Sequence, residues 1–170
     1  ECLGESKEEY ELRVESISEA FMSADRIVFF AISAKSGIYE SVVSNLDKAL
    51  LDLVAKRSQQ QSQSLNLSGK IAIDVSNREP KTKSGRTASA SLSNAERLQV
   101  LLDDMKCLGG HQQQHQKISV VKAFNSVSAY SMEDLEKKGS MMESVAVAGD
   151  CLQAKEAVIK FCQRIGFQSS

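Results

Sequence analysis

Polar residues that could bind a small ligand follow three apolar runs of the sequence, where each run is expected to end as a strand. An open α/β sheet binds its ligand outside the carboxyl ends of its parallel strands, so these residues are predicted to line one cleft. Asparagine side chains and backbone groups supply the donors and acceptors that a ligand carboxamide requires. The set consists of Ser33 and Lys35 after Asp25–Ile32, Ser76 and Asn77 after Ile71–Val75, and Phe124 and Asn125 after Ile118–Ala123.

Other groups with chemical potential are weaker candidates. His111 and His115 have the i, i+4 spacing that can hold a metal on a helix, but the glutamines between them and the glycines before them favour a flexible loop. Lys81, Lys83 and Arg86 form a basic patch that is typical of a solvated loop rather than a phosphate site. No spacing supports a Ser-His-Asp or Cys-His arrangement, so no catalytic residue is assigned.

The elements that position these residues alternate between strands and helices. Asp25–Ile32 and Ile71–Val75 are continuous apolar runs, which are typical of strands buried on both faces of a parallel sheet. Tyr39–Lys56 carries one apolar stripe at helical spacing. Ser93 and Glu96 form a capping-box signature, which predicts a helix that continues to about Asp104. This alternation predicts βαβ units.

The C-terminal third continues the alternation. Ile118–Ala123 is rich in β-branched residues and is predicted to be a strand of the same sheet. Ser144–Ala148 is a further short apolar strand, followed by a helix over Cys151–Ile165 with Asp150 as its N-cap and Gly166 as its stop. The Gln-rich segments 57–67 and 109–116 are predicted to be flexible, dispensable loops.

Four motifs in this order resemble one protein family. They are Gly69–Ile71 with Ile73–Asn77, Ser93–Glu96 with Leu98, Val121–Asn125, and Ser128-Ala129 followed by the aromatic Tyr130. They are similar to the NADPH oxidoreductase domain of the STEAP metalloreductases and, more distantly, to NADP oxidoreductases that reduce a deazaflavin coenzyme. The resemblance extends from about Val14 to Gly166.

This resemblance implies a function and a set of binding residues. In the family, NADPH passes hydride to a flavin (FAD), and electrons then cross the membrane through haem to reduce ferric or cupric ions. It implies that the nicotinamide ring lies near Ser76, Asn77, Ala123, Phe124 and Asn125. Tyr130 stands where the family often has Trp and is expected to stack on a ring. Ala34, Lys35 and Ser36 replace the family's Arg-Glu-His pattern.

One departure from the family concerns the phosphates. The sequence contains no G-x-G-x-x-G loop to place a pyrophosphate at a helix N-terminus, and no Ser-Arg pair for the 2′-phosphate. We therefore predict an α/β fold with an incomplete Rossmann-like parallel sheet and flanking helices, in which the first βαβ unit is missing. Residues 1–170 form a single partial NADP-binding domain, which alone should bind NADPH weakly or not at all.

Composition limits the remaining possibilities. The 170 residues carry a net charge of −1, which gives no reason to expect nucleic acid as a partner, and no apolar run has the length of a membrane span. Four dispersed cysteines favour a reducing compartment. By resemblance we expect a domain facing the cytosol, attached to a haem-binding membrane domain of a longer protein in the plasma or endosomal membrane, with a possible homo-oligomer.

Two alternatives to this reading stay open. The first is a non-catalytic fragment or partner-binding remnant, which the missing phosphate loop favours. The second is a soluble dehydrogenase of the pyrroline-carboxylate reductase type.

Overall fold

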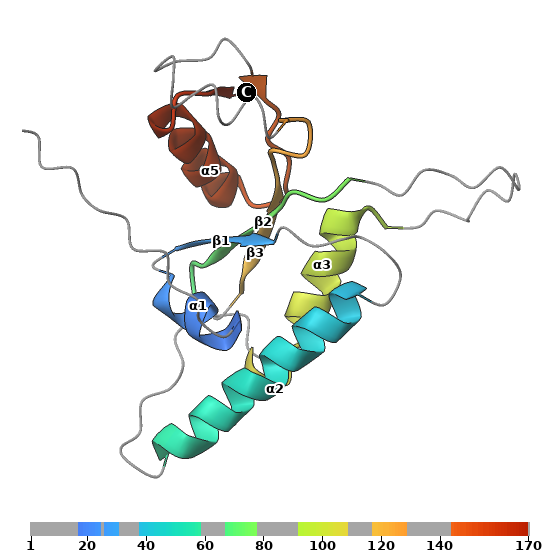
Figure 1. Ribbon diagram of the computed structural model, residues 1–170, viewed down its shortest axis with the longest axis vertical. Coiled ribbons are helices and arrows are strands. Elements are labelled where there is room, and N and C mark those ends of the chain that lie inside the picture. Colours follow the sequence, from blue (N-terminus) through green and yellow to red (C-terminus); the bar gives the residue numbers. More distant parts are fainter. Residues whose placement is uncertain are drawn as a thin grey trace, which may run out of the picture.

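A three-stranded parallel sheet forms the centre of the molecule (Figure 1). The computed structural model describes residues 17–24, 26–30, 38–58, 67–77, 92–108, 117–128 and 144–169. The strands are β1 (Ile27–Phe30), β2 (Ile71–Asp74) and β3 (Ser119–Lys122), in the order β1-β2-β3. This arrangement confirms the predicted α/β fold with a short parallel sheet.

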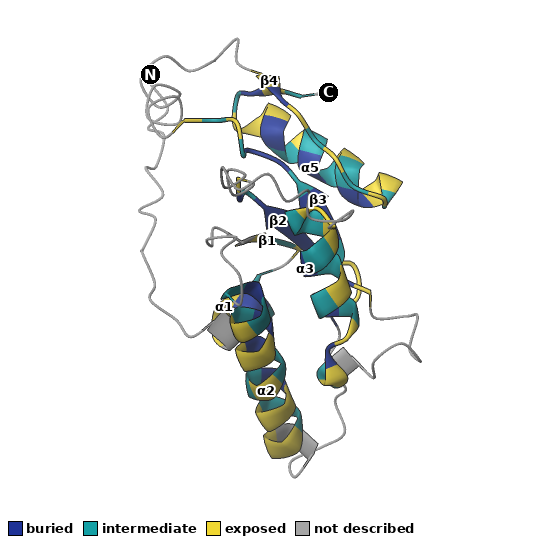
Figure 2. Cartoon of the chain, turned by 90° about the vertical axis from the view of Figure 1, so that its right-hand side faces the viewer, coloured by how far each residue is buried: buried dark blue, intermediate teal, exposed yellow. Residues whose placement is uncertain are grey.

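Helices cover both faces of the sheet (Figures 1 and 2). One face packs against α1 (Ile17–Ser23), α2 (Ile38–Ser58) and α3 (Asn94–Asp103), and the other against α5 (Leu152–Arg164). Side chains of β2 alternate between the two cores, with Ala72 on the α2 side and Ile71 and Ile73 on the α5 side. Because both faces are covered, the strand sequences are apolar almost throughout.

The helix α3 is fixed at its start and along the sheet. The Ser93 hydroxyl accepts a hydrogen bond from the Glu96 amide at 3.2 Å, and the Glu96 carboxylate accepts one from the Ser93 amide at 2.6 Å, which confirms the capping box. Gln99 donates to the Ile118 carbonyl and accepts from the Val120 amide. The outer edge of β3 is therefore occupied by a side chain of α3.

A second, two-stranded parallel sheet lies at the C-terminal end of the molecule. It consists of β4 (Ser144–Val145) and β5 (Gln168–Ser169). The strand predicted over Ser144–Ala148 is confirmed for Ser144–Val145 alone, and Ala148 forms an antiparallel bridge with Lys122 through bonds of 2.7 and 3.0 Å. Ser144 and Val145 pair with β5. The sequence of β5 has no apolar run from which this pairing could be predicted.

The start of α5 differs from the prediction, and its end agrees with the prediction. Cys151, not Asp150, is the N-cap, and its side chain makes no capping hydrogen bond. At the other end Gly166 has φ 95°, and the amides of Gly166 and Phe167 bond the carbonyls of Gln163 and Cys162. This is a Schellman motif, in which glycine supplies the left-handed residue, and it confirms the predicted stop.

The predicted loop over residues 57–67 is wrong at both of its ends. Arg57 and Ser58 are the last residues of α2, and Leu67 is fully buried in the core to which α2 also contributes. Residues 59–66 and 109–116 lie outside the described residues, as do the histidine pair and the basic patch, namely His111, His115, Lys81, Lys83 and Arg86. Of the helices that are described, none combines the length and apolarity needed to cross a membrane.

Candidate functional site

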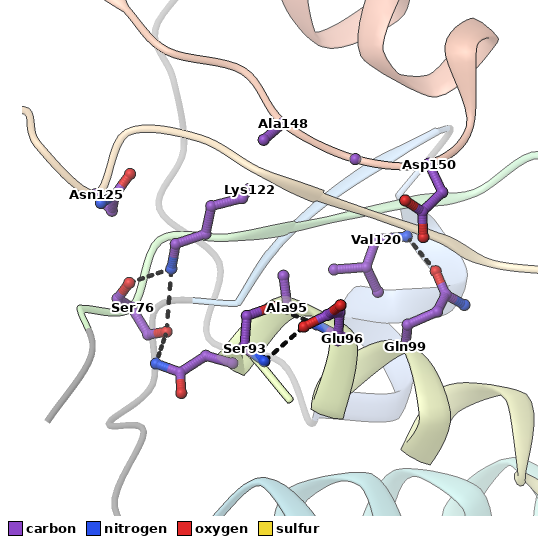
Figure 3. Close-up of a pocket in the computed structure, with 12 residues that line it drawn as sticks. Ser76, Ser93, Ala95, Glu96, Gln99, Val120, Lys122, Asn125, Ala148 and Asp150 are labelled. Atoms are coloured by element: carbon purple, nitrogen blue, oxygen red, sulfur yellow. Dashed lines mark hydrogen bonds between the residues drawn. The ribbon is translucent and has the colours of Figure 1, made fainter. Parts of the chain in front are cut away.

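A pocket of about 440 Å³ lies between α3, β3 and the segment that leads into α5 (Figure 3). Gly149 brings that segment close to the sheet, since a Cβ atom built on it would lie only 3.0 Å from the Val120 carbonyl oxygen. The lining is Ser76, Ser93, Asn94, Ala95, Glu96, Gln99, Val120, Lys122, Asn125, Ala148, Gly149 and Asp150.

The structure brings two of the predicted binding residues together in this pocket. Ser76 follows β2 and Asn125 follows β3, so both lie beyond the carboxyl ends of neighbouring parallel strands. Figure 3 shows both residues at the same end of the pocket. The site thus has the placement expected of a ligand site in an open α/β sheet.

The backbone directly before Asn125 is in an unusual conformation. Phe124 has φ 60°, in the left-handed region that a bulky side chain rarely adopts. A tight turn follows, in which the Val127 amide bonds the Phe124 carbonyl at 3.1 Å. Such strain costs on the order of 1–3 kcal/mol and is often found at binding sites. Here the turn redirects the chain so that Asn125 lines the pocket while Phe124 stays buried.

An ion pair between Lys122 and the buried Asp74 adjoins the pocket. Asp74 is fully buried, and its Oδ2 atom accepts a hydrogen bond from the Lys122 ammonium at 2.9 Å. The same ammonium bonds the Ser76 carbonyl and lies 3.3 Å from the Ser76 hydroxyl oxygen. The Asp74 Oδ1 atom accepts from the Ser76 amide at 2.9 Å and from the Tyr39 hydroxyl at 2.8 Å. These bonds fix the Ser76 loop relative to β3.

Burial and hydrogen bonding shift the acid–base properties of this network. Burial alone would raise the pKa of Asp74, but the hydrogen bonds from Lys122, Ser76 and Tyr39 outweigh it, and the pKa lies below the usual value. Burial raises the pKa of Tyr39 to about 12. Asp74 is therefore a carboxylate and Tyr39 a neutral donor at neutral pH.

The raised pKa of Tyr39 predicts a loss of stability at alkaline pH. The pKa of Tyr39 is near 10 in the unfolded chain and about 12 in the folded one, so between these pH values the hydroxyl keeps its proton only in the folded state. Its contribution to the free energy of unfolding is therefore complete below pH 10 and is lost between about pH 10 and 12. Two pKa units correspond to roughly 2–3 kcal/mol. Chemical unfolding of the wild type and Tyr39→Phe between pH 9 and 12 should show a loss that is larger in the wild type by about this amount, and parallel pH profiles would contradict it.

Of the other predicted binding residues, the three that the structure describes do not line the pocket. Ala123 and Phe124 are buried in the core beneath α5, on the other side of the sheet. Asn77 is exposed, and its carbonyl accepts a hydrogen bond from the Asn94 side chain at 3.2 Å. Ser33, Lys35 and Tyr130 lie outside the described residues.

The sequence reasoning missed the charged pair and the third wall of the pocket. Asp74 and Lys122 are single charges near the ends of apolar strands, and a charge in such a run is a signal that it has a partner. The close approach of Gly149 to Val120 is not indicated by any sequence motif. Within the described residues, no three His, Cys, Asp or Glu side chains gather to hold a metal ion.

Comparison with known proteins identifies the fold. No family model and no curated protein matches the chain. Its structure is similar to that of a hypothetical protein from Sinorhizobium meliloti, with a TM-score of 0.53 and 20% identity over 90% of this chain and 58% of the other. A candidate F420-dependent NADP reductase from Arthrobacter sp. FB24 has a TM-score of 0.47 and 22% identity, over 89% and 55%.

The first of these similarities shows that the chain has the same α/β fold as the Sinorhizobium protein. The chain spans less than two thirds of the length of either solved structure.

Proposed function

We propose that the pocket binds the nicotinamide end of NADPH, in an NADPH-dependent oxidoreductase domain. The observation that supports this most is the convergence of Ser76 and Asn125 beyond the ends of two parallel strands, around one pocket. Two motifs of the metalloreductase resemblance form walls of that pocket, since Ser93–Glu96 begins α3 and Val121–Asn125 runs along β3 and its turn.

The residues of the pocket fit a nicotinamide ring. The Asn125 amide can both donate to and accept from a carboxamide. The Ser76 hydroxyl is already bonded to Tyr39, Asn94 and Lys122, so Ser76 shapes the wall of the pocket. Ala95, Val120 and Ala148 offer apolar surface to the faces of the ring. When bound, NADPH supplies a hydride, and the contribution of the chain is to orient the ring and to limit its contact with water. The pyrophosphate is different, because the sequence has no glycine-rich loop that fits it.

The finer parts of the proposal are supported by the sequence resemblance alone. They are a flavin as hydride acceptor, ferric or cupric ions as final acceptors, and a haem-binding membrane domain of a longer protein as partner. Facing the cytosol from a plasma or endosomal membrane belongs with them. The missing glycine-rich loop favours one rival, in which the fold is kept as a non-catalytic partner-binding domain.

Titration with NADPH tests the proposal. A few hydrogen bonds of about 0.5–1.5 kcal/mol each barely offset the cost of association, so we predict a dissociation constant of about 1 mM or weaker. Asn125→Ala should weaken binding about three- to tenfold. Asn45→Ala, which removes an exposed amide of α2, is the matched control and should have no effect.

Calorimetry gives the affinity, and amide NMR shifts at Asn125 and Gly149 locate the ligand. Micromolar or tighter binding would mean that a phosphate site exists elsewhere in the chain. Binding that Asn125→Ala leaves unchanged would contradict the proposed placement of the ring.

A further inference from the structure

The positive charge of the pocket is already used within the protein. Among the residues that the structure describes, Lys122 is the one cationic side chain that lines it. Its ammonium group has three donors, and it meets three acceptors, namely Asp74 Oδ2, the Ser76 carbonyl and the Ser76 hydroxyl oxygen. The Asp74 carboxylate also neutralises its charge. Lys122 therefore offers an incoming anion neither a spare donor nor a net charge.

The negative charge of the pocket, in contrast, belongs to two carboxylates on its walls. Glu96 lies in the first turn of α3, and hydrogen bonds from Ser93 hold the pKa of its carboxyl below the usual value, so it is ionised at neutral pH. Asp150 is exposed on the opposite wall, before α5. Figure 3 shows Glu96 and Asp150 on the two sides of the cavity.

The helix dipoles do not reverse this balance. The N-terminus of α3 carries roughly half a positive charge, but Glu96 lies within its first turn and opposes it. Asp150 stands in the same way directly before the N-cap of α5. The pocket therefore disfavours phosphate and favours a neutral or cationic group.

We infer that the pocket distinguishes the two redox forms of a nicotinamide ring by charge, and binds the cationic pyridinium of the oxidised form more tightly than the neutral ring. This inference rests on the proposed function, because it concerns the same pocket. Glu96 and Asp150 determine the preference, and Asn125 contributes equally to both forms. A tenfold preference for the oxidised form would lower the potential of the bound two-electron couple by about 30 mV, which makes the bound NADPH a stronger reductant.

Two small probes separate charge from shape. 1-Methylnicotinamide is a permanent pyridinium cation, and nicotinamide is a neutral ring with the same carboxamide. Neither carries a phosphate. NMR titration of the full chain at low ionic strength should give about three- to tenfold tighter binding of the cation, as expected for carboxylates at a partly hydrated site.

Variants of Glu96 and Asp150 test whether these two residues cause the preference for the cation. In Glu96→Gln/Asp150→Asn the cation should lose its advantage while nicotinamide binds as before, because glutamine can still complete the capping box. Asp52→Asn, an exposed change on α2, should leave both affinities unaltered.

The possible outcomes distinguish this inference from the proposed function. If both probes shift the amides of Asn125 and Gly149 but nicotinamide binds as tightly as the cation, the charge inference is overturned and the nicotinamide pocket stands. A cation preference that persists in the double variant also overturns it. If neither probe binds at the pocket, the proposed function fails and the inference fails with it.

Discussion

Replacement of Lys122 by methionine should lower the free energy of unfolding by about 3–5 kcal/mol, because it leaves a buried charge without its partner. Asp74 is 0% exposed and Lys122 only 24% exposed, so water cannot take the place of the ammonium. The Tyr39 hydroxyl and the Ser76 amide would still donate to the carboxylate, but they carry no formal charge. Urea unfolding gives the difference directly.

Removal of both charges should be far less harmful than removal of one. In the double variant Asp74→Asn/Lys122→Met the amide keeps an acceptor for the Ser76 amide, and a buried ion pair is often replaceable at little net cost. The double-mutant cycle should therefore show a large favourable coupling between the two residues. Lys48→Met, an exposed lysine of α2, is the control and should change stability by less than about 0.5 kcal/mol. A loss below about 1 kcal/mol in Lys122→Met would show that solvent reaches Asp74.

Replacement of Phe124 sets two effects against each other. The ring is 4% exposed, with ring centroids 5.7 Å from Phe29 and 5.8 Å from Phe167. Loss of such a ring costs about 3–5 kcal/mol. Relief of a left-handed backbone recovers only about 1–2 kcal/mol, and only in glycine. Packing therefore wins, and both Phe124→Ala and Phe124→Gly should be destabilised.

The order of these two variants tests the strain itself. At an ordinary helical position alanine is more stable than glycine by about 1 kcal/mol. At φ 60° the order should reverse, so that Phe124→Gly is more stable than Phe124→Ala by a similar amount. Glu156, which is exposed on α5, supplies the control pair, in which Glu156→Ala should be more stable than Glu156→Gly. An unreversed order at Phe124 would mean that the left-handed turn carries no strain.

The strands of the main sheet and its long helices could be predicted because local pattern and final structure agree. Runs such as Ile71–Val75 are buried on both faces, and α3 begins with a capping box. The pairing of β4 could not be predicted, because its partner is Gln168–Ser169, which has no apolar pattern of its own. Its pairing is decided by how α5 packs, which is a property of the tertiary structure.

The site could be predicted only in part for a related reason. Ser76 and Asn125 follow strands, and strand ends can be found in a sequence. The partnership of Asp74 with Lys122 depends on the register of β2 against β3, which brings the two residues side by side. The alternation of faces likewise places Ala123 on the α5 side, which a list of residues near a strand end does not reveal.

The pairing of the main sheet has a consequence for how the chain folds. Ile27 pairs with Ile71, and Ile71 pairs with Ser119, so each ladder joins segments that are distant in sequence. A long loop must close before either ladder gains its hydrogen bonds, and such topologies fold slowly. The unit β4-α5-β5, in contrast, closes within residues 144–169. We therefore expect this unit to form early and to present Val158 and Cys162 as the surface on which the slower sheet is completed.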